Sequence, residues 1–284
     1  MTRGIGPWGP ARADDLAALC DAAAPAERLT GDELLACCWE DPGVVLGTAD
    51  GRAAVSACVQ THGDRVVGFV KLIAVEPAAQ GLGVGRALLD AAHGWAFDGQ
   101  GAAEVRVAGP GPFYIWPGVD FRATRALCLF ESFGYWPVGA EFNMACPTTY
   151  RADPPAGVTI DRALDDDHAA AVLALVAAHW PGWVPETSRA LDHGACFAAR
   201  DAGGSVLGFG CHSVNRAGWI GPMGTDPERH HGGVGGAVLG ALCRDLMVAG
   251  FADAEIAWVG PAGFYARTAG AAVSRVFRTL TRRR

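Results

Sequence analysis

A glycine-rich turn occurs twice in this chain in the same frame. The first copy is Gln80-Gly-Leu-Gly83-Val-Gly85 and the second is His230-His-Gly-Gly233-Val-Gly235, with Gly83 and Gly233 150 positions apart. Each copy follows a short apolar run and opens a segment with apolar residues at helical spacing. Backbone N–H groups and the positive end of a helix dipole would meet at each turn, and both suit a phosphate group. Two such turns in register predict a duplicated phosphate-binding domain.

The segments around each turn predict a strand before it and a helix after it. In the first half we expect a strand at 66–75 and a helix at 85–97. In the second half we expect a strand at 219–225 and a helix ending near 249. Further strands and short helices are predicted at 104–108, 127–133, 254–259, 264–269 and 273–280.

A second stretch of sequence also repeats. Ala103-Glu-Val-Arg-Val-Ala-Gly-Pro-Gly-Pro-Phe-Tyr114 matches Ala254-Glu-Ile-Ala-Trp-Val-Gly-Pro-Ala-Gly-Phe-Tyr265, at an offset of 151. A lone Glu-Val or Phe-Tyr pair would be ordinary strand and core. Matching pairs at matching offsets instead indicate internal duplication.

Length and composition agree with two domains. The chain has 284 residues, of which 50% are hydrophobic and 19% charged. This suits two globular domains of about 140 residues each. Residues 147–155 contain three prolines and little apolar character. We therefore predict an N-terminal domain over 1–147, a linker over 148–155 and a C-terminal domain over 156–284.

Charge and cysteine usage exclude several classes of protein. The net charge is −7, and the run 281–284 is interpreted as a solvated tail, so nucleic-acid binding is not expected. No uncharged apolar run is long enough for a membrane span, and no signal pattern opens the chain. The nine cysteines form no CxxC pair or Cys/His cluster, which predicts reduced thiols in a cytoplasmic protein with no metal.

Each half resembles the GNAT superfamily of acyl-CoA-dependent N-acetyltransferases. The family signature is a strand, then Gln/Arg-x-x-Gly-x-Gly/Ala, then a helix. Gln80-Gly-Leu-Gly83-Val-Gly85 fits it fully, whereas His230 replaces the usual Gln or Arg in the second copy. The family also carries a short helix with a Tyr near its start and a Gly after it, and Phe264-Tyr265-Ala-Arg-Thr-Ala-Gly270 fits that pattern. The resemblance covers nearly the whole chain as two tandem copies.

The resemblance implies an α/β (α+β) fold of two tandem GNAT-like domains, each a mixed, twisted sheet flanked by helices. It implies acetyl-CoA as cosubstrate, lying where two parallel strands splay apart. The pantetheine arm would pair with the strand before each turn, and the pyrophosphate would lie on the turn itself. The implied strand residues are Ile73, Ala74, Val75, Met223, Gly224 and Thr225. The implied turn residues are Gly81, Leu82, Gly83, Val84, Gly85, Arg86, His231, Gly232, Gly233, Val234, Gly235 and Gly236.

Acetyl transfer to an amine needs a general base and a proton donor for the leaving sulfur. Tyr265 is the candidate acid, since a Tyr hydroxyl is uncharged at rest and can donate to a thiolate. Phe130 occupies the corresponding position of the first half and cannot donate a proton. Tyr114 could substitute for it, because it matches Tyr265 in the local repeat. We therefore expect the second half to be catalytic, with catalysis by the first half as the alternative.

Glu255, on the strand before Tyr265, is the candidate general base, although a carboxylate on a solvated strand face is an equal reading. The expected activity is acetyl transfer to the primary amine of a small polar metabolite such as an amino sugar or aminoglycoside. The alternative from another class is a protein that binds or senses acetyl-CoA without transferring it. A tandem copy can pack against its twin as two subunits would, so we expect a monomer rather than a homodimer.

Overall fold

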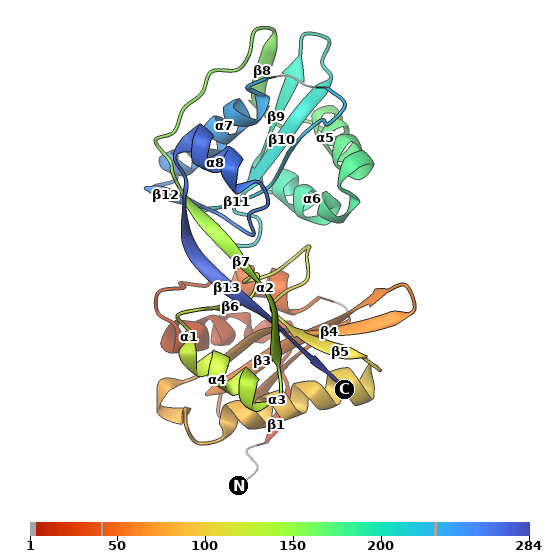
Figure 1. The fold of residues 1–284 in the computed structure, drawn as a ribbon, viewed down its shortest axis with the longest axis vertical. Coiled ribbons are helices and arrows are strands. Elements are labelled where there is room, and N and C mark those ends of the chain that lie inside the picture. Colours follow the sequence, from red (N-terminus) through yellow and green to blue (C-terminus); the bar gives the residue numbers. More distant parts are fainter. Residues whose placement is uncertain (1–3, 41, 230–231) are drawn as a thin grey trace. The chain divides into compact units, whose positions relative to one another are not determined.

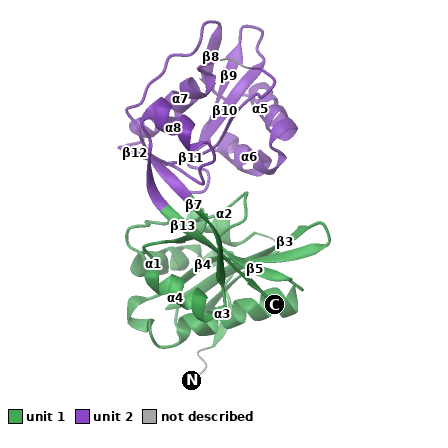
Figure 2. Ribbon diagram, in the orientation of Figure 1, with its two compact units in different colours: residues 1–141, 276–284 green, residues 142–275 purple. Residues whose placement is uncertain are grey.

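The computed structural model describes residues 4–40, 42–229 and 232–284. These residues form two compact units, shown in Figure 2. Unit 1 comprises residues 1–141 and 276–284, and unit 2 comprises residues 142–275. These limits differ from the predicted ones, since the predicted linker 148–155 lies inside unit 2 and the end of the chain lies inside unit 1.

Unit 1 is built on a mixed sheet in the order β1-β2-β3-β4-β5-β13 (Figure 1). β4 and β5 are parallel, and the other neighbours in this order are antiparallel. Its elements are β1 Ile5–Pro7, α1 Ala13–Ala23, α2 Gly31–Cys38, β2 Gly43–Thr48, β3 Ala53–His62, β4 Arg65–Val75, α3 Val84–His93, β5 Glu104–Val107, β6 Val119–Asp120 and α4 Thr124–Ser132, with parts of β7 Trp136–Pro147 and β13 Ala272–Arg283.

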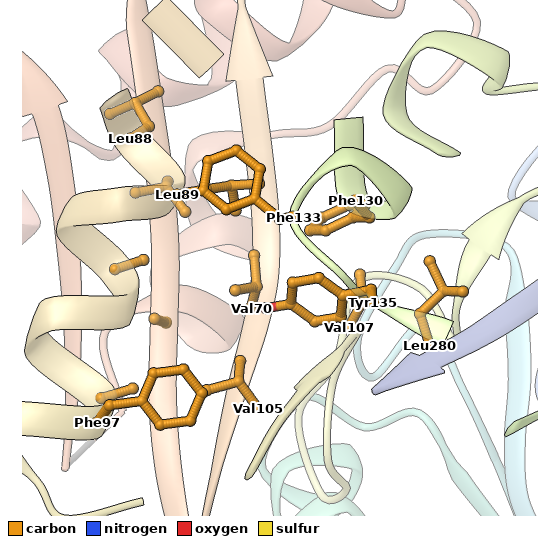
Figure 3. Close-up of a cluster of buried hydrophobic side chains, with 14 of the residues drawn as sticks. Val70, Leu88, Leu89, Phe97, Val105, Val107, Phe130, Phe133, Tyr135 and Leu280 are labelled. Atoms are coloured by element: carbon orange, nitrogen blue, oxygen red, sulfur yellow. The ribbon is translucent and has the colours of Figure 1, made fainter. Parts of the chain in front are cut away.

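Helices cover both faces of the unit 1 sheet. On one face, Leu88 of α3, Phe130 of α4 and Val107 of β5 belong to one cluster of buried side chains, drawn in Figure 3. On the other face, Leu34 of α2 packs with Leu72 of β4. Apolar residues at helical spacing on α3 predict its buried face, and burial of each such side chain contributes about 1.5–3 kcal/mol.

Unit 2 repeats this plan with the strand order β7-β12-β11-β10-β9-β8. β11 and β12 form its parallel pair. Its elements are β8 Val158–Arg162, α5 Asp166–His179, α6 Val184–Asp192, β9 Cys196–Asp201, β10 Val206–His212, β11 Trp219–Thr225, α7 Val234–Val248, β12 Asp253–Ile256 and α8 Ala262–Ala269, with parts of β7 and β13.

The faces of unit 2 are covered as in unit 1. Leu242 of α7 and Tyr265 of α8 pack with Ile256 of β12 on one face. On the other face, the Trp180 ring after α5 lies so close to Gly224 that a Cβ there would be 2.8 Å from it. Side-chain caps start some of these helices: Asp165 accepts the His168 N–H at the start of α5. The predicted architecture, an α/β fold of two similar domains that each have a mixed sheet flanked by helices, is confirmed.

Two strands are shared between the units along the chain. β7 starts in unit 1 and ends in unit 2, where it pairs with β12, with Met144 opposite Ile256. β13 starts in unit 2 and ends in unit 1, where it pairs with β5, with Leu280 opposite Val107. β13 corresponds to the predicted last strand, whereas no strand was expected at 136–147. Unit 1 therefore completes its sheet with a segment from the end of the sequence, and unit 2 completes its sheet with the second part of a strand that starts in unit 1.

Candidate functional site

Each unit has a parallel strand pair that stops pairing before one strand ends. β4 pairs with β5 only from Val67 to Val70, so residues 71–75 extend beyond the paired region. β11 pairs with β12 only at Trp219 and Ile220, so residues 221–225 extend beyond it. We call these two backbone segments edge 1 and edge 2. They contain all six strand residues that the resemblance assigned to the pantetheine arm.

The hydrogen bonds show which backbone groups face edge 1. Val70 accepts the Ala108 N–H on the β5 side at 2.8 Å, whereas the Glu76 N–H donates to Arg52 on the β3 side at 2.9 Å. Between Val70 and Glu76, the pairing of β4 with β3 shifts register opposite Ser56 and Ala57. The shift reverses the side to which the following N–H and C=O groups of β4 point. Counting back from Glu76, the N–H and C=O groups of Ile73 and Val75 point to the unpaired side of edge 1. Those of Ala74 point to β3.

Edge 2 has the same arrangement. Ile220 accepts the Ala257 N–H on the β12 side at 3.3 Å, and the Asp226 N–H donates to Leu207 on the β10 side at 2.9 Å. The register shifts between these points. The N–H and C=O groups of Met223 and Thr225 therefore point to the unpaired side of edge 2, while those of Gly224 point to β10. An extended ligand with amide groups could add to either edge as a strand would.

The glycine turns lie directly after these edges. Gly83 precedes α3 with a φ of 79°, and Gly233 precedes α7 with a φ of 91°. Residues other than glycine rarely adopt such positive φ angles. A Cβ on Gly85 would be 3.2 Å from Leu129 of α4, and one on Gly235 would be 3.2 Å from Phe264 of α8. The first glycine thus sets the turn, and the second allows a neighbouring helix to pack closely.

The turns have the geometry of a phosphate-binding site at a helix N-terminus. N–H groups in the first turn of a helix have no intrahelical acceptor and point out of the helix N-terminus. The other assigned residues are placed there by the same turns: Gly81, Leu82, Val84 and Arg86 in unit 1, and Gly232, Val234 and Gly236 in unit 2. His231 lies outside the described residues. In unit 1 the Gln80 side chain donates to the Val75 carbonyl at 2.9 Å, so it bonds a group that faces edge 1.

Tyr265 lies on α8 in the core of unit 2. Its side chain is 6% exposed and packs with residues of α7 and β12. Burial, with a smaller contribution from Cys146, raises the pKa of Tyr265 to about 12, so the hydroxyl remains protonated at neutral pH. Phe130, which is 2% exposed, is the buried residue of α4 in unit 1. The two helices therefore carry a proton donor and a phenyl ring, respectively, at corresponding positions.

Glu255 lies on the opposite face of the unit 2 sheet from Tyr265. Its neighbours Ala254 and Ile256 pack in the same cluster as Tyr265, and successive side chains of a strand alternate between faces. Glu255 accepts a hydrogen bond from Asn143 Nδ2 at 2.5 Å and lies 3.9 Å from Arg275. Its side chain is 25% exposed, so the carboxylate is partly accessible.

The sheet register assigns Glu255 a different counterpart from the one in the sequence repeat. The repeat aligns Glu255 with Glu104. In the sheets, Val107 and Ile256 are the last paired residues of β5 and β12, and the residues before them are Arg106 and Glu255. Arg106 is ion-paired with Glu104 at 2.7 Å. Unit 1 thus has a cation where unit 2 has the candidate base.

A second cation lies at the start of edge 1. Lys71 follows the last paired residue of β4, as Gly221 does in β11. The Lys71 side chain is fully buried, forms a salt bridge with Glu40, and donates to the Phe113 carbonyl at 2.6 Å. Ile115, two residues further on, is fully buried in the cluster that α1 and α2 form with Leu72. Residues of the β5–β6 loop therefore occupy this face of unit 1.

Tyr114, the alternative acid, belongs to this loop. It is 8% exposed, and a Cβ on Gly109 would be 2.2 Å from its Cβ. The sequence did not point to Asn143, which contacts the candidate base, or to Trp258, whose N–H donates to Asn143. Asn143 lies on β7, which carried no strand signal.

Within residues 4–40, 42–229 and 232–284, no cluster of three His, Cys, Asp or Glu side chains suits a metal ion. In the same ranges, every helix is too short or too polar to cross a membrane.

Comparison with known proteins finds a family match for part of the chain and structures that share its fold. Residues 35–137 match the profile of the acetyltransferase (GNAT) domain. No curated protein matches the chain in sequence. Many solved structures match the chain, and those that share its fold over nearly its whole length include the following three. The first is a glucosamine N-acetyltransferase region of a fungal multi-domain β-N-acetylglucosaminidase, with TM-score 0.76, 18% identity, and coverage of 98% of this chain but only 38% of that one.

The other two structures match along their whole length. A GCN5-related N-acetyltransferase from Sphaerobacter thermophilus has TM-score 0.67 and 21% identity, with 100% of this chain and 96% of that one covered. A tandem GNAT protein from the clavulanic acid biosynthesis pathway has TM-score 0.74 and 14% identity, with 99% and 98% covered. The chain therefore carries a GNAT acetyltransferase domain within residues 35–137 and has, over its whole length, the fold of a tandem GNAT protein.

Proposed function

We propose that this protein is an acetyl-CoA-dependent N-acetyltransferase that acetylates the primary amine of a small polar metabolite, and that unit 2 performs the reaction. One observation carries the choice of unit. On the face covered by α5 and α6, the parallel pair of unit 2 presents the carboxylate of Glu255. On the corresponding face, unit 1 presents Arg106 and the buried ammonium of Lys71. The carboxylate of Glu255 can take up a proton from a cationic amine, whereas the guanidinium of Arg106 and the ammonium of Lys71, both held in ion pairs, cannot act as bases.

The two faces of the unit 2 sheet divide the chemistry between them. Acetyl-CoA supplies the acetyl group as a thioester, and the peptide groups of Met223 and Thr225 would bind its pantetheine arm. Glu255 accepts a proton from the ammonium of the acceptor, directly or through water, so that the neutral amine can attack the acetyl carbonyl. The Tyr265 hydroxyl donates a proton to the departing sulfur. Each proton transfer contributes roughly 10²–10⁴-fold to the rate.

A second assignment is favoured by the family match, which lies inside unit 1. In that case unit 1 is catalytic with Tyr114 as the acid, and unit 2 supports it. A protein that binds acetyl-CoA without transferring it is the third possibility. The acceptor belongs to the proposal too: an amino sugar is a suitable first choice because the fungal neighbour is described as a glucosamine N-acetyltransferase region.

The test measures thiol release from acetyl-CoA against amino sugars, aminoglycosides, polyamines, amino acids and short peptides. Tyr265→Phe keeps the buried ring and removes only the hydroxyl, and Tyr114→Phe is the matched control. We expect Tyr265→Phe to lower turnover by roughly 10²-fold or more and Tyr114→Phe to leave it near normal. The reverse pattern would assign catalysis to unit 1. Binding of acetyl-CoA without thiol release for any amine would favour the binding protein.

A further inference from the structure

Asn143 contacts both the candidate base and the loop that follows its strand. It lies on β7 within unit 2 and is fully buried. Its Nδ2 donates to Glu255 Oε1 at 2.5 Å, and its Oδ1 accepts the Trp258 N–H at 2.8 Å. A carboxylate can only accept and a peptide N–H can only donate, so the two contacts fix the orientation of the amide.

The backbone around Asn143 is held in place by its own hydrogen bonds. The Val259 N–H donates to the Phe142 carbonyl at 3.0 Å. Ser274 Oγ donates to the Asn143 carbonyl at 3.4 Å. Asn143 is therefore anchored through its backbone while both ends of its side chain are used. This arrangement suits a residue that positions other groups.

Trp258 is the second residue that Asn143 holds, and its backbone is strained. Its φ is 47°, which a bulky residue adopts only when its surroundings impose it. It follows Ala257, whose N–H makes the last bond between β12 and β11. The turn at Trp258 thus lies beside the start of edge 2. Trp258 is 37% exposed. Strain of this kind is concentrated at functional sites.

Unit 1 repeats the positive φ, at Ala108 directly after β5 with φ of 78°, but it repeats neither the amide nor the carboxylate. β13 pairs with β5 as β7 pairs with β12, and by that register Thr279 corresponds to Asn143. Threonine has no amide, and the residue corresponding to Glu255 is Arg106. The base and the amide that contacts it therefore occur together at the parallel strand pair of unit 2, whereas a positive φ after the strand occurs in both units.

We infer that Asn143 is a positioning residue for acetyl transfer in unit 2: it orients the Glu255 carboxylate and fixes the Trp258 turn at the start of edge 2. The inference rests on the proposed function. It assigns a role in the reaction of unit 2 to a strand that begins in the other half of the sequence.

Asn143→Asp separates the two contacts. The aspartate has nearly the same shape and can still accept the Trp258 N–H, but it places a like charge against Glu255. Two adjacent carboxylates raise the pKa of one of them. We therefore expect the acid limb of the kcat/KM profile to move to higher pH by about one pH unit or more, with the KM for acetyl-CoA unchanged. An unchanged acid limb would overturn the inference.

Asn143→Ala and Thr279→Ser complete the set. Loss of both contacts in Asn143→Ala is expected to lower kcat by roughly 10–10²-fold, since small misplacements of catalytic groups have effects of this size. Thr279→Ser, the unit 1 match, should keep the wild-type profile. Carboxylate NMR titration of Glu255 in the wild type and Asn143→Asp gives a readout independent of turnover. If that titration responds but no form of the protein releases thiol, the proposed function has failed and the positioning role with it.

Discussion

The two units share a scaffold and differ in the side chains beside it. Each has a parallel strand pair, an unpaired edge after a register shift, and a glycine with positive φ before a helix. Beside these features unit 1 carries Lys71 and Arg106, and unit 2 carries Gly221 and Glu255 at the corresponding positions. The shared backbone features suit cofactor binding, and the differing side chains decide whether a proton acceptor lies beside the strand pair. A duplicated domain can thus keep the cofactor-binding backbone while the side chains beside it change.

The loops after the parallel pairs differ as well. In unit 2, only residues 257–261 separate β12 from α8. In unit 1, residues 108–123 separate β5 from α4. Within them, the Phe113 carbonyl accepts a hydrogen bond from Lys71, and the Ile115 side chain packs against α1 and α2. The longer loop stabilises unit 1 over the face where an acceptor would approach. This difference suggests a structural role for the loop and a catalytic role for unit 2.

The largest expected effect comes from removing the carboxylate that distinguishes unit 2. Glu255→Gln keeps the side-chain volume but cannot take up a proton. We expect kcat/KM for the amine to fall by roughly 10²–10⁴-fold, as for loss of a general base. Steady-state thiol release with the best amine of the panel measures this.

Glu104→Gln is the matched control, because the sequence repeat aligns Glu104 with Glu255. Glu104 bonds Arg65 and Arg106 in unit 1, so this change should leave turnover near the wild-type value. Equal losses in both variants would contradict the assignment of catalysis to unit 2. A loss confined to Glu104→Gln would transfer it to unit 1.

The next effect concerns stability, at the buried cation that distinguishes unit 1. Lys71→Met leaves the Glu40 carboxylate without its ammonium partner. Breaking a buried pair typically lowers the free energy of unfolding by about 3–5 kcal/mol. Glu40 is 20% exposed, so we expect the low end of this range, about 3 kcal/mol. Urea unfolding should show the loss in unit 1, with acetyl transfer by unit 2 retained under native conditions.

The double variant Lys71→Met/Glu40→Gln tests the cause. Neutralising Glu40 removes the uncompensated charge, so much of the lost stability should return. A single variant as stable as the wild type would show that the pair contributes little. A double variant no more stable than Lys71→Met would point to lost packing of the Lys71 chain instead.

Much of the fold was predictable from local signals. The glycine turns gave both the strand–turn–helix units, because positive φ and close helix packing leave few alternatives to glycine. Strand 66–75, for example, ends at Val75 as expected, and a helix follows at Val84. The predicted roles of Tyr265 and Glu255 stay predictions, and the structure places these residues on opposite faces of one sheet.

The rest depended on long-range pairing, which the sequence does not encode locally. β7 was missed because Pro137 and Gly139 interrupt its pattern and its first five residues are exposed. Since Asn143 lies on that strand, its contact with Glu255, 112 positions away, could not be foreseen. The counterpart of Glu255 was misjudged for a similar reason, because repeat alignment and sheet register differ by two residues.

The smallest expected effect concerns His93, a buried histidine of α3 whose position in unit 2 is taken by another residue type. Arg282 donates to His93 Nδ1 at 3.0 Å, and His93 Nε2 is 2.7 Å from the Tyr135 hydroxyl. Because an arginine only donates, His93 must be neutral, with its proton on Nε2. The corresponding positions of unit 2, by helix start and sheet register, are Cys243 and Cys146, whose sulfurs are 3.9 Å apart.

Burial, and then the charge of Arg282, lower the pKa of His93 from 6.5 to about 4. Between these two values the unfolded chain binds a proton that the folded chain does not, so stability falls as the pH falls through this window. The full difference would correspond to about 3 kcal/mol, and screening by nearby solvent reduces it, so we expect unit 1 to lose about 1–2 kcal/mol of unfolding free energy between about pH 6.5 and 4. His93→Gln, which can keep both hydrogen bonds and does not titrate, should remove this part of the slope. If urea unfolding gave equal slopes for the wild type and His93→Gln, the acid sensitivity of unit 1 would have to come from its carboxylates.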